Sequence, residues 1–152
     1  MRFLFLALTL LSPLLWSQEQ SQDKLLYLLA LSLHKEERSH EALSLLEDLC
    51  ELYPESPLFV MASEKMAEIF REKKMYGQAA KIYRMLAVRL GPTLQAMNYR
   101  LQEAKILRQL GHYVKAEEIL KQIIYLLPES PAATEAENEL KSISFVRQLH
   151  AE

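Results

Sequence analysis

The segment Pro54-Glu55-Ser56-Pro57 recurs as Pro128-Glu129-Ser130-Pro131, two periods of 37 residues further along the chain. Sequence periods of about 20 to 50 residues are typical of solenoids, in which each unit buries its apolar face against the next unit. The period therefore predicts a stack of repeated units and favours a binding surface as the function. Two sets of alanines share the spacing of 37: Ala30, Ala67 and Ala104, and Ala42, Ala79 and Ala116.

The composition favours one folded, helical domain. Half of the 152 residues are hydrophobic and 25 % are charged, which argues against wholesale disorder. Only three glycines are present, which favours helices over a turn-rich β fold. The net charge of −2 gives no clustered basic face for nucleic acid and no polybasic stretch for anionic lipid. We therefore expect neither nucleic acid nor a lipid surface as a partner.

The first 17 residues have the pattern of a signal peptide. Arg2 supplies a positive charge, an apolar run follows, and the small residue Ser17 precedes the polar Gln18. The run is shorter than the ~20 residues that cross a bilayer. We expect export with cleavage of residues 1–17, which leaves a domain of residues 18–152. The alternative is an uncleaved anchor, through which alone the chain would contact a membrane.

Apolar residues recur at helical spacing in seven segments. Pro54 and Pro128 end helices because proline lacks the backbone donor, and Gly91 ends one by adopting a left-handed cap. Ser56 is expected to cap the helix that follows it, with Pro57 in the first helical position. The expected helices span residues 23–37, 40–53, 58–73, 76–90, 94–110, 113–127 and 132–149.

These helices group into three pairs and one terminal helix. In each pair, an alanine of the first helix precedes an alanine of the second helix by twelve residues, and methyl side chains let antiparallel helices approach closely. Lys141 takes the place of the first alanine in the last helix, where a charge would keep another helix away. We therefore expect that helix to cap the array. The expected repeats span about 21–56, 57–93 and 94–130, and the capping helix spans 131–149.

The offsets within each unit resemble the tetratricopeptide repeat. That family has a small residue in its first helix, an alanine early in its second, then a bulky residue and a closing proline, usually with a period of about 34. The resemblance implies an all-α fold, a right-handed α-solenoid of three such pairs plus a C-terminal capping helix. Glu103 departs from the pattern, because Leu29 and Met66 are apolar at that position. The bulky residues here are Leu46, Tyr83 and Leu120, and the terminators are Pro54, Gly91 and Pro128.

The segment Tyr53–Pro57, together with the export signal, resembles repeats of bacterial envelope proteins of the Tol-Pal and outer-membrane assembly systems. This narrower resemblance implies a location in the periplasm or the cell envelope. It also implies that the partner is another envelope protein or peptide.

If the units stack as in this family, the first helix of each pair lines a concave groove. The groove is expected to have an apolar end, an acidic middle and a basic end, which suits an extended or helical peptide. The alternative is that its charges form a solvated face, with pairs worth about 0.2–0.5 kcal/mol each. The expected partner-binding residues are Tyr27, Leu31, His34, Met61, Glu64, Glu68, Arg71, Asn98, Leu101, Lys105 and Arg108.

Motifs of catalysis and of cofactor binding are missing from the sequence. The four histidines lack metal-ligand spacing, the three glycines form no phosphate loop, and no nucleophile motif occurs. Cys50, the single cysteine, falls at an apolar helical position and is expected to pack. We expect no enzyme activity, cofactor or metal. The expected function is a non-enzymatic adaptor or scaffold. The alternatives are a periplasmic chaperone or assembly factor for envelope proteins, and a self-associating structural subunit.

Overall fold

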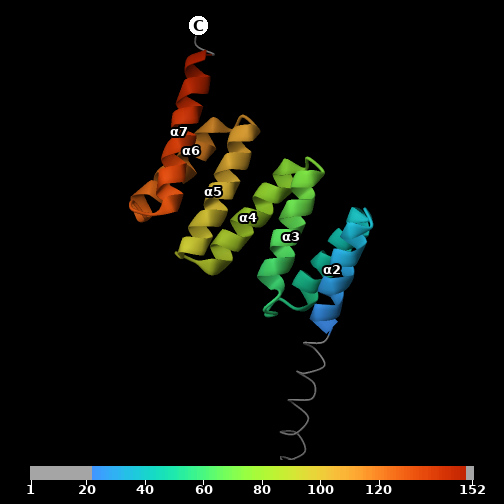
Figure 1. Ribbon diagram of the computed structural model, residues 1–152. Coiled ribbons are helices and arrows are strands. Elements are labelled where there is room, and N and C mark those ends of the chain that lie inside the picture. The colour runs from blue at the N-terminus through green and yellow to red at the C-terminus, as the bar shows by residue number, and fades with distance from the viewer. Residues whose placement is uncertain (1–21, 150–152) are drawn as a thin grey trace, which may run out of the picture. The chain divides into compact units, whose positions relative to one another are not determined.

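The computed structural model describes residues 22–149, and the expected signal peptide, residues 1–17, lies outside them. Within this part the chain is all-α, as expected, and every expected helix is present to within two residues at either end. A first helix covers residues 22–35. It is followed by α2 (Ser39–Leu52), α3 (Phe59–Glu72), α4 (Tyr76–Leu90), α5 (Leu94–Gln109), α6 (Tyr113–Leu126) and α7 (Pro131–Leu149) (Figure 1).

The described residues form two compact units, 22–66 and 67–149, whose boundary lies inside α3. In the first unit the first helix and α2 run antiparallel. The hydroxyl of Tyr53, just after α2, donates to Oε1 of Gln22 at 2.6 Å. Small residues let the two helices approach, since Ala30 and Ala42 are 1 % and 0 % exposed. The leucines buried with them are Leu33, Leu43, Leu46 and Leu49.

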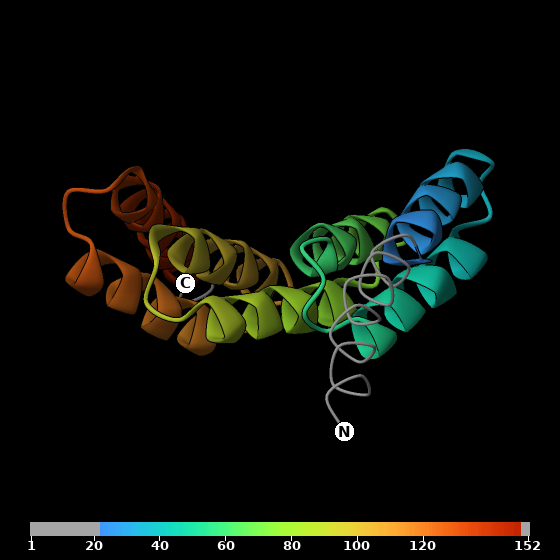
Figure 2. The same ribbon diagram turned by 90° about the horizontal axis from the view of Figure 1, so that it is seen from below.

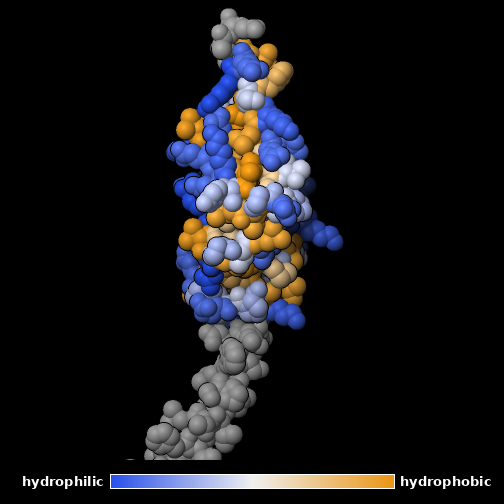
Figure 3. Space-filling model, turned by 90° about the vertical axis from the view of Figure 1, so that its left-hand side faces the viewer, coloured by the Kyte–Doolittle hydropathy of each residue, from blue (hydrophilic) through white to orange (hydrophobic). Residues whose placement is uncertain are grey.

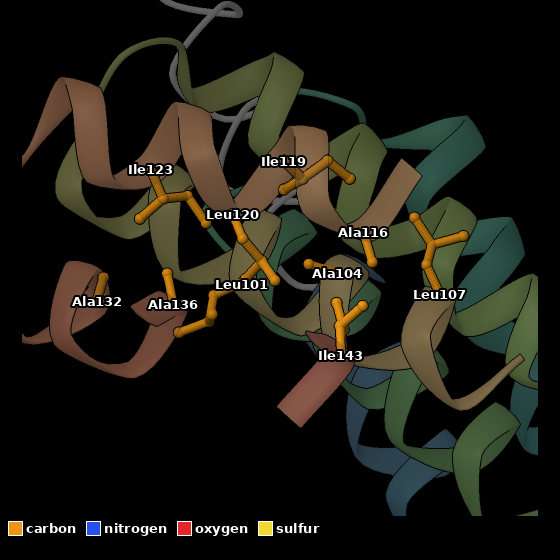
Figure 4. Close-up of a cluster of buried hydrophobic side chains, with 10 residues drawn as sticks. All are labelled: Leu101, Ala104, Leu107, Ala116, Ile119, Leu120, Ile123, Ala132, Ala136 and Ile143. Atoms are coloured by element: carbon orange, nitrogen blue, oxygen red, sulfur yellow. The ribbon is translucent and has the colours of Figure 1, made fainter. Parts of the chain in front are cut away.

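The second unit has two layers. α5 and α7 lie in one layer, α4 and α6 lie in the other, and α5 packs against all three (Figure 2). The core between them is aliphatic, and burying each large side chain of this kind contributes about 1.5–3 kcal/mol. Its members are Leu101, Ala104, Leu107, Ala116, Ile119, Leu120, Ile123, Ala132, Ala136 and Ile143 (Figure 4).

The last helix covers this core with one face. Ala132, Ala136 and Ile143 of α7 are buried in the cluster, whereas Lys141 is exposed. The face of α7 toward the unit is thus apolar. The position that holds a small alanine in the first helix of each pair, where a neighbouring helix can approach, holds the charged Lys141 in α7. This is the arrangement expected of a helix that ends an array.

One backbone turn closes the first helix of every pair. Glu37, Lys74 and Gly111, spaced by 37 residues, have φ angles of 64°, 59° and 77°. Of the three, only Gly111 lacks a side chain that opposes this left-handed conformation. In each turn the next residue bonds back to a helix carbonyl, as in a Schellman motif. These bonds are Arg38 N to Leu33 O (2.9 Å), Met75 N to Phe70 O (2.7 Å) and His112 N to Leu107 O (2.8 Å).

The two Pro-Glu-Ser-Pro segments form different contacts. The Ser56 hydroxyl donates to Oδ2 of Asp23 and accepts from Leu58 N at 3.0 Å, and α3 begins only at Phe59. Ser56 makes the expected cap-type bond, because its hydroxyl accepts from the amide of Leu58, whereas Pro57 is not the first helical residue, since α3 begins at Phe59. The hydroxyl makes both contacts, because it donates its hydrogen to Asp23, which is 4 % exposed, and accepts through a lone pair.

In the second copy the serine caps a helix that begins directly after it. Ser130 Oγ accepts from Ala133 N at 3.1 Å, and Pro131 is the first residue of α7. Met97 stands 33 residues before Ser130, as Asp23 does before Ser56, and a thioether cannot bind the hydroxyl as a carboxylate does. The same four residues therefore serve two roles.

Candidate functional site

Five of the expected groove residues lie in the first unit. Tyr27 lines an open pocket of about 390 Å³ together with Leu28 and Leu58. Leu31 and His34, further along the first helix, are half-buried. Met61 and Glu64 on α3 are exposed. This part of the surface offers apolar contacts, as expected.

The first helix exposes more apolar surface than the sequence analysis assigned to it. Leu25, Leu28 and Leu29 are 65 %, 53 % and 47 % exposed. They follow the i, i+3, i+4 spacing of one helix face. Their spacing could have shown this face in the sequence, but leucines at that spacing are equally typical of a core. Structure was needed to decide between the two.

In the second unit, two expected groove residues line a polar pocket. Glu68 and Arg71 of α3 surround an open pocket of about 470 Å³ together with Glu72, Tyr76 and Gln109. Its lining carries two carboxylates and one guanidinium, so it can hold a charged or hydrogen-bonding group beside Tyr76. Of the acidic residues expected in the middle of the groove, Glu68 lines this pocket.

The expected basic end is occupied by α7. Arg108 Nε donates to Oε2 of Glu139 at 2.6 Å, and Lys105 Nζ donates to Oε1 of Glu135. The two carboxylates are four residues apart and share one face of α7. Both cations are therefore neutralised within the unit, and Asn98 is the exposed residue on this face of α5. Glu135 and Glu139 were not expected from the sequence. They lie 30 and 31 residues after the cations that they bind, and no local pattern connects them.

Leu101 does not belong to the surface. It is 2 % exposed and packs in the core cluster with side chains of α6 and α7 (Figure 4). Around α5 it lies about 60° from the core residue Ala104, so the cover provided by α6 and α7 reaches it. Leu101 is therefore a core residue and not one of the partner-binding residues, contrary to expectation.

Glu103, which departs from the repeat pattern, is the centre of a buried ionic cluster. Its side chain is 1 % exposed. Oε1 accepts from Arg84 Nε at 2.7 Å, and Oε2 accepts from Arg100 Nη1 at 2.6 Å. A carboxylate out of water is costly unless it is paired and hydrogen-bonded. Two guanidinium groups supply both conditions, which explains how a charge occupies a position that is apolar in the other units.

The described part of the chain offers no group of side chains suited to a metal ion and no helix suited to a membrane span. Across residues 22–149, histidine, cysteine, aspartate and glutamate do not form any group of three that could hold a metal ion. No helix there combines the length and the apolar character that a membrane span requires. Figure 3 shows hydrophobic patches between hydrophilic side chains on one face.

The comparisons with known proteins bear first on the pair formed by the first helix and α2. Residues 24–56 match the family model of the tetratricopeptide repeat. The TPR domain of Arabidopsis OM64 has a similar structure, with a TM-score of 0.57 and 15 % identity over 81 % of this chain and 97 % of that domain. At this identity the likeness concerns the fold alone. No curated protein matches the sequence. The tetratricopeptide repeat family is thus supported by one unit at the level of sequence and by most of the chain at the level of fold.

Proposed function

We propose that the protein is a non-enzymatic adaptor or scaffold of the bacterial cell envelope. It binds a segment of a partner protein on the exposed faces of the first helices of its repeats. Tetratricopeptide repeats generally mediate protein–protein interactions. The observation that carries the proposal is the pocket of Glu68, Arg71, Glu72, Tyr76 and Gln109, whose first two residues are among the expected groove residues.

The lining of this pocket selects the partner's chemistry. Glu68 and Glu72 favour a lysine or arginine side chain, and Tyr76 offers an aromatic surface for its aliphatic stem or its cation. Arg71 can donate hydrogen bonds to a neighbouring carboxylate or carbonyl of the same segment. Because Lys105 and Arg108 are paired with α7, the partner is anchored by its basic residues rather than by its acidic ones.

The location in the envelope is supported by the signal-peptide pattern of residues 1–17 and by the Tyr53–Pro57 segment. N-terminal sequencing of the protein from its native cells tests the first point. A mature chain that starts near Gln18 is expected, and an intact Met1 in the cytosolic fraction would contradict export.

Binding is tested by a crosslinking pull-down from the native envelope. Glu68→Gln and Arg71→Gln remove charges from the pocket and are expected to lower the recovery of the main crosslinked partner at least tenfold. Glu118→Gln, on the exposed face of α6, is the matched control and leaves recovery unchanged. If both pocket variants retain the partner at the level of the control, the pocket is not the binding site. Circular dichroism confirms that each variant is folded.

Self-association is a second candidate function, favoured by the three exposed leucines of the first helix. Leu28→Glu places a charge at the centre of this face. If the protein assembles through it, light scattering gives a mass above the 17.7 kDa of the full-length monomer for the parent and a lower mass for the variant. A parent that is monomeric at 0.1 mM excludes this function. Suppression of aggregation of unrelated unfolded proteins would instead indicate the chaperone alternative.

A further inference from the structure

A third pocket lies beside the buried Glu103, between α4 and α5. It has a volume of about 410 Å³ and is lined by Arg84 and Arg100 together with apolar groups that include Val88, Pro92 and Met97. Both arginines that hold Glu103 therefore also face this pocket. Among the described residues that line it, none is acidic.

The charges around this pocket do not balance. Two guanidinium groups share the single carboxylate of Glu103, which leaves an excess of one positive charge. The Arg84 side chain is 54 % exposed, lines the pocket and donates to Glu103 through Nε. Arg100 Nη2 makes one long contact, 3.4 Å, to Gln122 Oε1. Guanidinium groups bind carboxylates through paired N–H groups, and this geometry is available here.

The apolar part of the lining supplies a second recognition element. Val88 is 76 % exposed at the pocket, on the α4 side. Met97, on the α5 side, is half-buried and adapts its shape readily to a bound side chain. A ligand that fits must place an aliphatic group next to a negative charge.

This pocket is separate from the site of the proposed function. The two pockets share no lining residue. The two sites also prefer opposite charges, because the pocket of Glu68 and Glu72 is acidic and this one is basic.

We propose that the pocket of Arg84 and Arg100 binds an acidic segment of a protein partner. A glutamate or aspartate of that segment binds the guanidinium groups, and an adjacent aliphatic side chain enters the pocket against Val88 and Met97. The cluster around Glu103 holds both arginines in place before the partner arrives, so little side-chain freedom is lost on binding.

The competing account is that the arginines only neutralise Glu103. The two accounts differ in what they predict for a capped seven-residue peptide with a leucine between two glutamates. We expect this peptide, titrated to millimolar concentration into the ¹⁵N-labelled protein, to shift the backbone amide signals of residues 84–100 in a saturable manner. The same peptide with glutamines is expected to bind at least tenfold more weakly. Absence of shifts with the glutamate peptide, or equal shifts with both peptides, would overturn the proposal.

Three variants test whether this pocket is where the peptide binds. Val88→Glu places a carboxylate at the pocket one turn from Arg84, where it competes with the peptide for the guanidinium, and it is expected to reduce peptide affinity at least tenfold. Val114→Glu, on α6 at a position 61 % exposed, is the matched control and leaves the affinity unchanged. Arg84→Lys keeps the charge but loses the paired N–H geometry, and an intermediate affinity is expected. Equal affinities for all three variants would exclude this pocket as the site.

Discussion

Arg108 of α5 lies with its Nε 2.6 Å from Oε2 of Glu139 on α7. This pair and the neighbouring pair of Lys105 and Glu135 join two helices of the same layer along one face. The acidic groups that pair with Arg108 and Lys105 therefore belong to the protein itself. A partner that uses its own acidic groups on this face must displace both carboxylates of α7.

The two pairs between α5 and α7 should differ in their contribution to stability. The Glu139 side chain is 17 % exposed and that of Glu135 is 51 % exposed. Glu139→Gln is expected to lower the free energy of unfolding by about 1–2 kcal/mol. Glu135→Gln should cost below ~1 kcal/mol, as is usual for exposed pairs. Urea denaturation measures both, with the exposed Glu137→Gln as control. A larger loss for Glu135→Gln than for Glu139→Gln would contradict the burial argument.

The cluster around Glu103 should respond unequally to loss of its members. Arg100→Met leaves a buried carboxylate with one cation, at an expected cost of about 3–5 kcal/mol. Glu103→Met leaves two arginines that reach solvent, so about 1–2 kcal/mol is expected. The double variant should recover part of the loss of Arg100→Met, because the stranded charge is gone. Unfolding in urea provides the comparison, and a cost for Glu103→Met that equals that of Arg100→Met would refute this asymmetry.

Ser56 and Ser130 should differ in the energy that couples each of them to the residue 33 positions earlier. In a double-mutant cycle, Asp23→Ala and Ser56→Ala are expected to couple by about 0.5–2 kcal/mol because the two side chains share a hydrogen bond. The matched cycle of Met97→Ala and Ser130→Ala should show coupling below about 0.5 kcal/mol. Ser130→Ala alone costs about 1 kcal/mol as a lost helix cap. Equal couplings in the two cycles would mean that the segments do not differ in role.

Leu101 and Asn98 lie one turn apart on α5 and should behave in opposite ways. Leu101→Ala opens a cavity in the core cluster and is expected to cost about 2–5 kcal/mol. Asn98→Ala alters an exposed position and should change the free energy of unfolding by less than about 0.5 kcal/mol. Thermal melts report both changes. An unchanged melting temperature for Leu101→Ala would mean that Leu101 is not part of the core.

The left-handed turns can be tested by exchanging glycine. Lys74→Gly removes a side chain from a residue with φ of 59° and is expected to stabilise the protein by about 0.5–1 kcal/mol. Gly111→Ala, at φ of 77°, should destabilise it by about 1–2 kcal/mol, although the space around Gly111 is open. Melting temperatures of the two variants that shift in the same direction would count against this account.

The helices could be predicted from sequence because their ends are determined by local chemistry. Pro54, Gly91 and Pro128 stop helices through their own backbones, and the buried alanines mark contact points that any neighbour requires. These signals lie within one or two turns of the residues that they affect. No knowledge of the rest of the fold was needed to use them.

The site was predicted less well because its properties depend on distant residues. Whether Leu101 is buried depends on α6 and α7, and whether Lys105 is available depends on Glu135, which lies 30 residues away. The hydroxyl of Ser56 is taken by Asp23, 33 residues earlier. The helical pattern around Leu101, Lys105 and Ser56 gives no sign of these partners. Glu103 departs from the apolar repeat pattern, but its role as the centre of an ionic cluster depends on Arg84 in the preceding helix.

The three left-handed turns also bear on how such a chain can be rearranged. Their hydrogen bonds run between backbone atoms, so the turn after Leu33, after Phe70 and after Leu107 accepts glutamate, lysine or glycine at its tip. A recombination that joins the first helix of one pair to the second helix of another at these tips would create a junction that is already compatible with both halves. The Pro-Glu-Ser-Pro segments do not share this freedom, because Ser56 is tied to Asp23. The turns inside the pairs, and not the segments between them, are the natural crossover points for shuffling this protein.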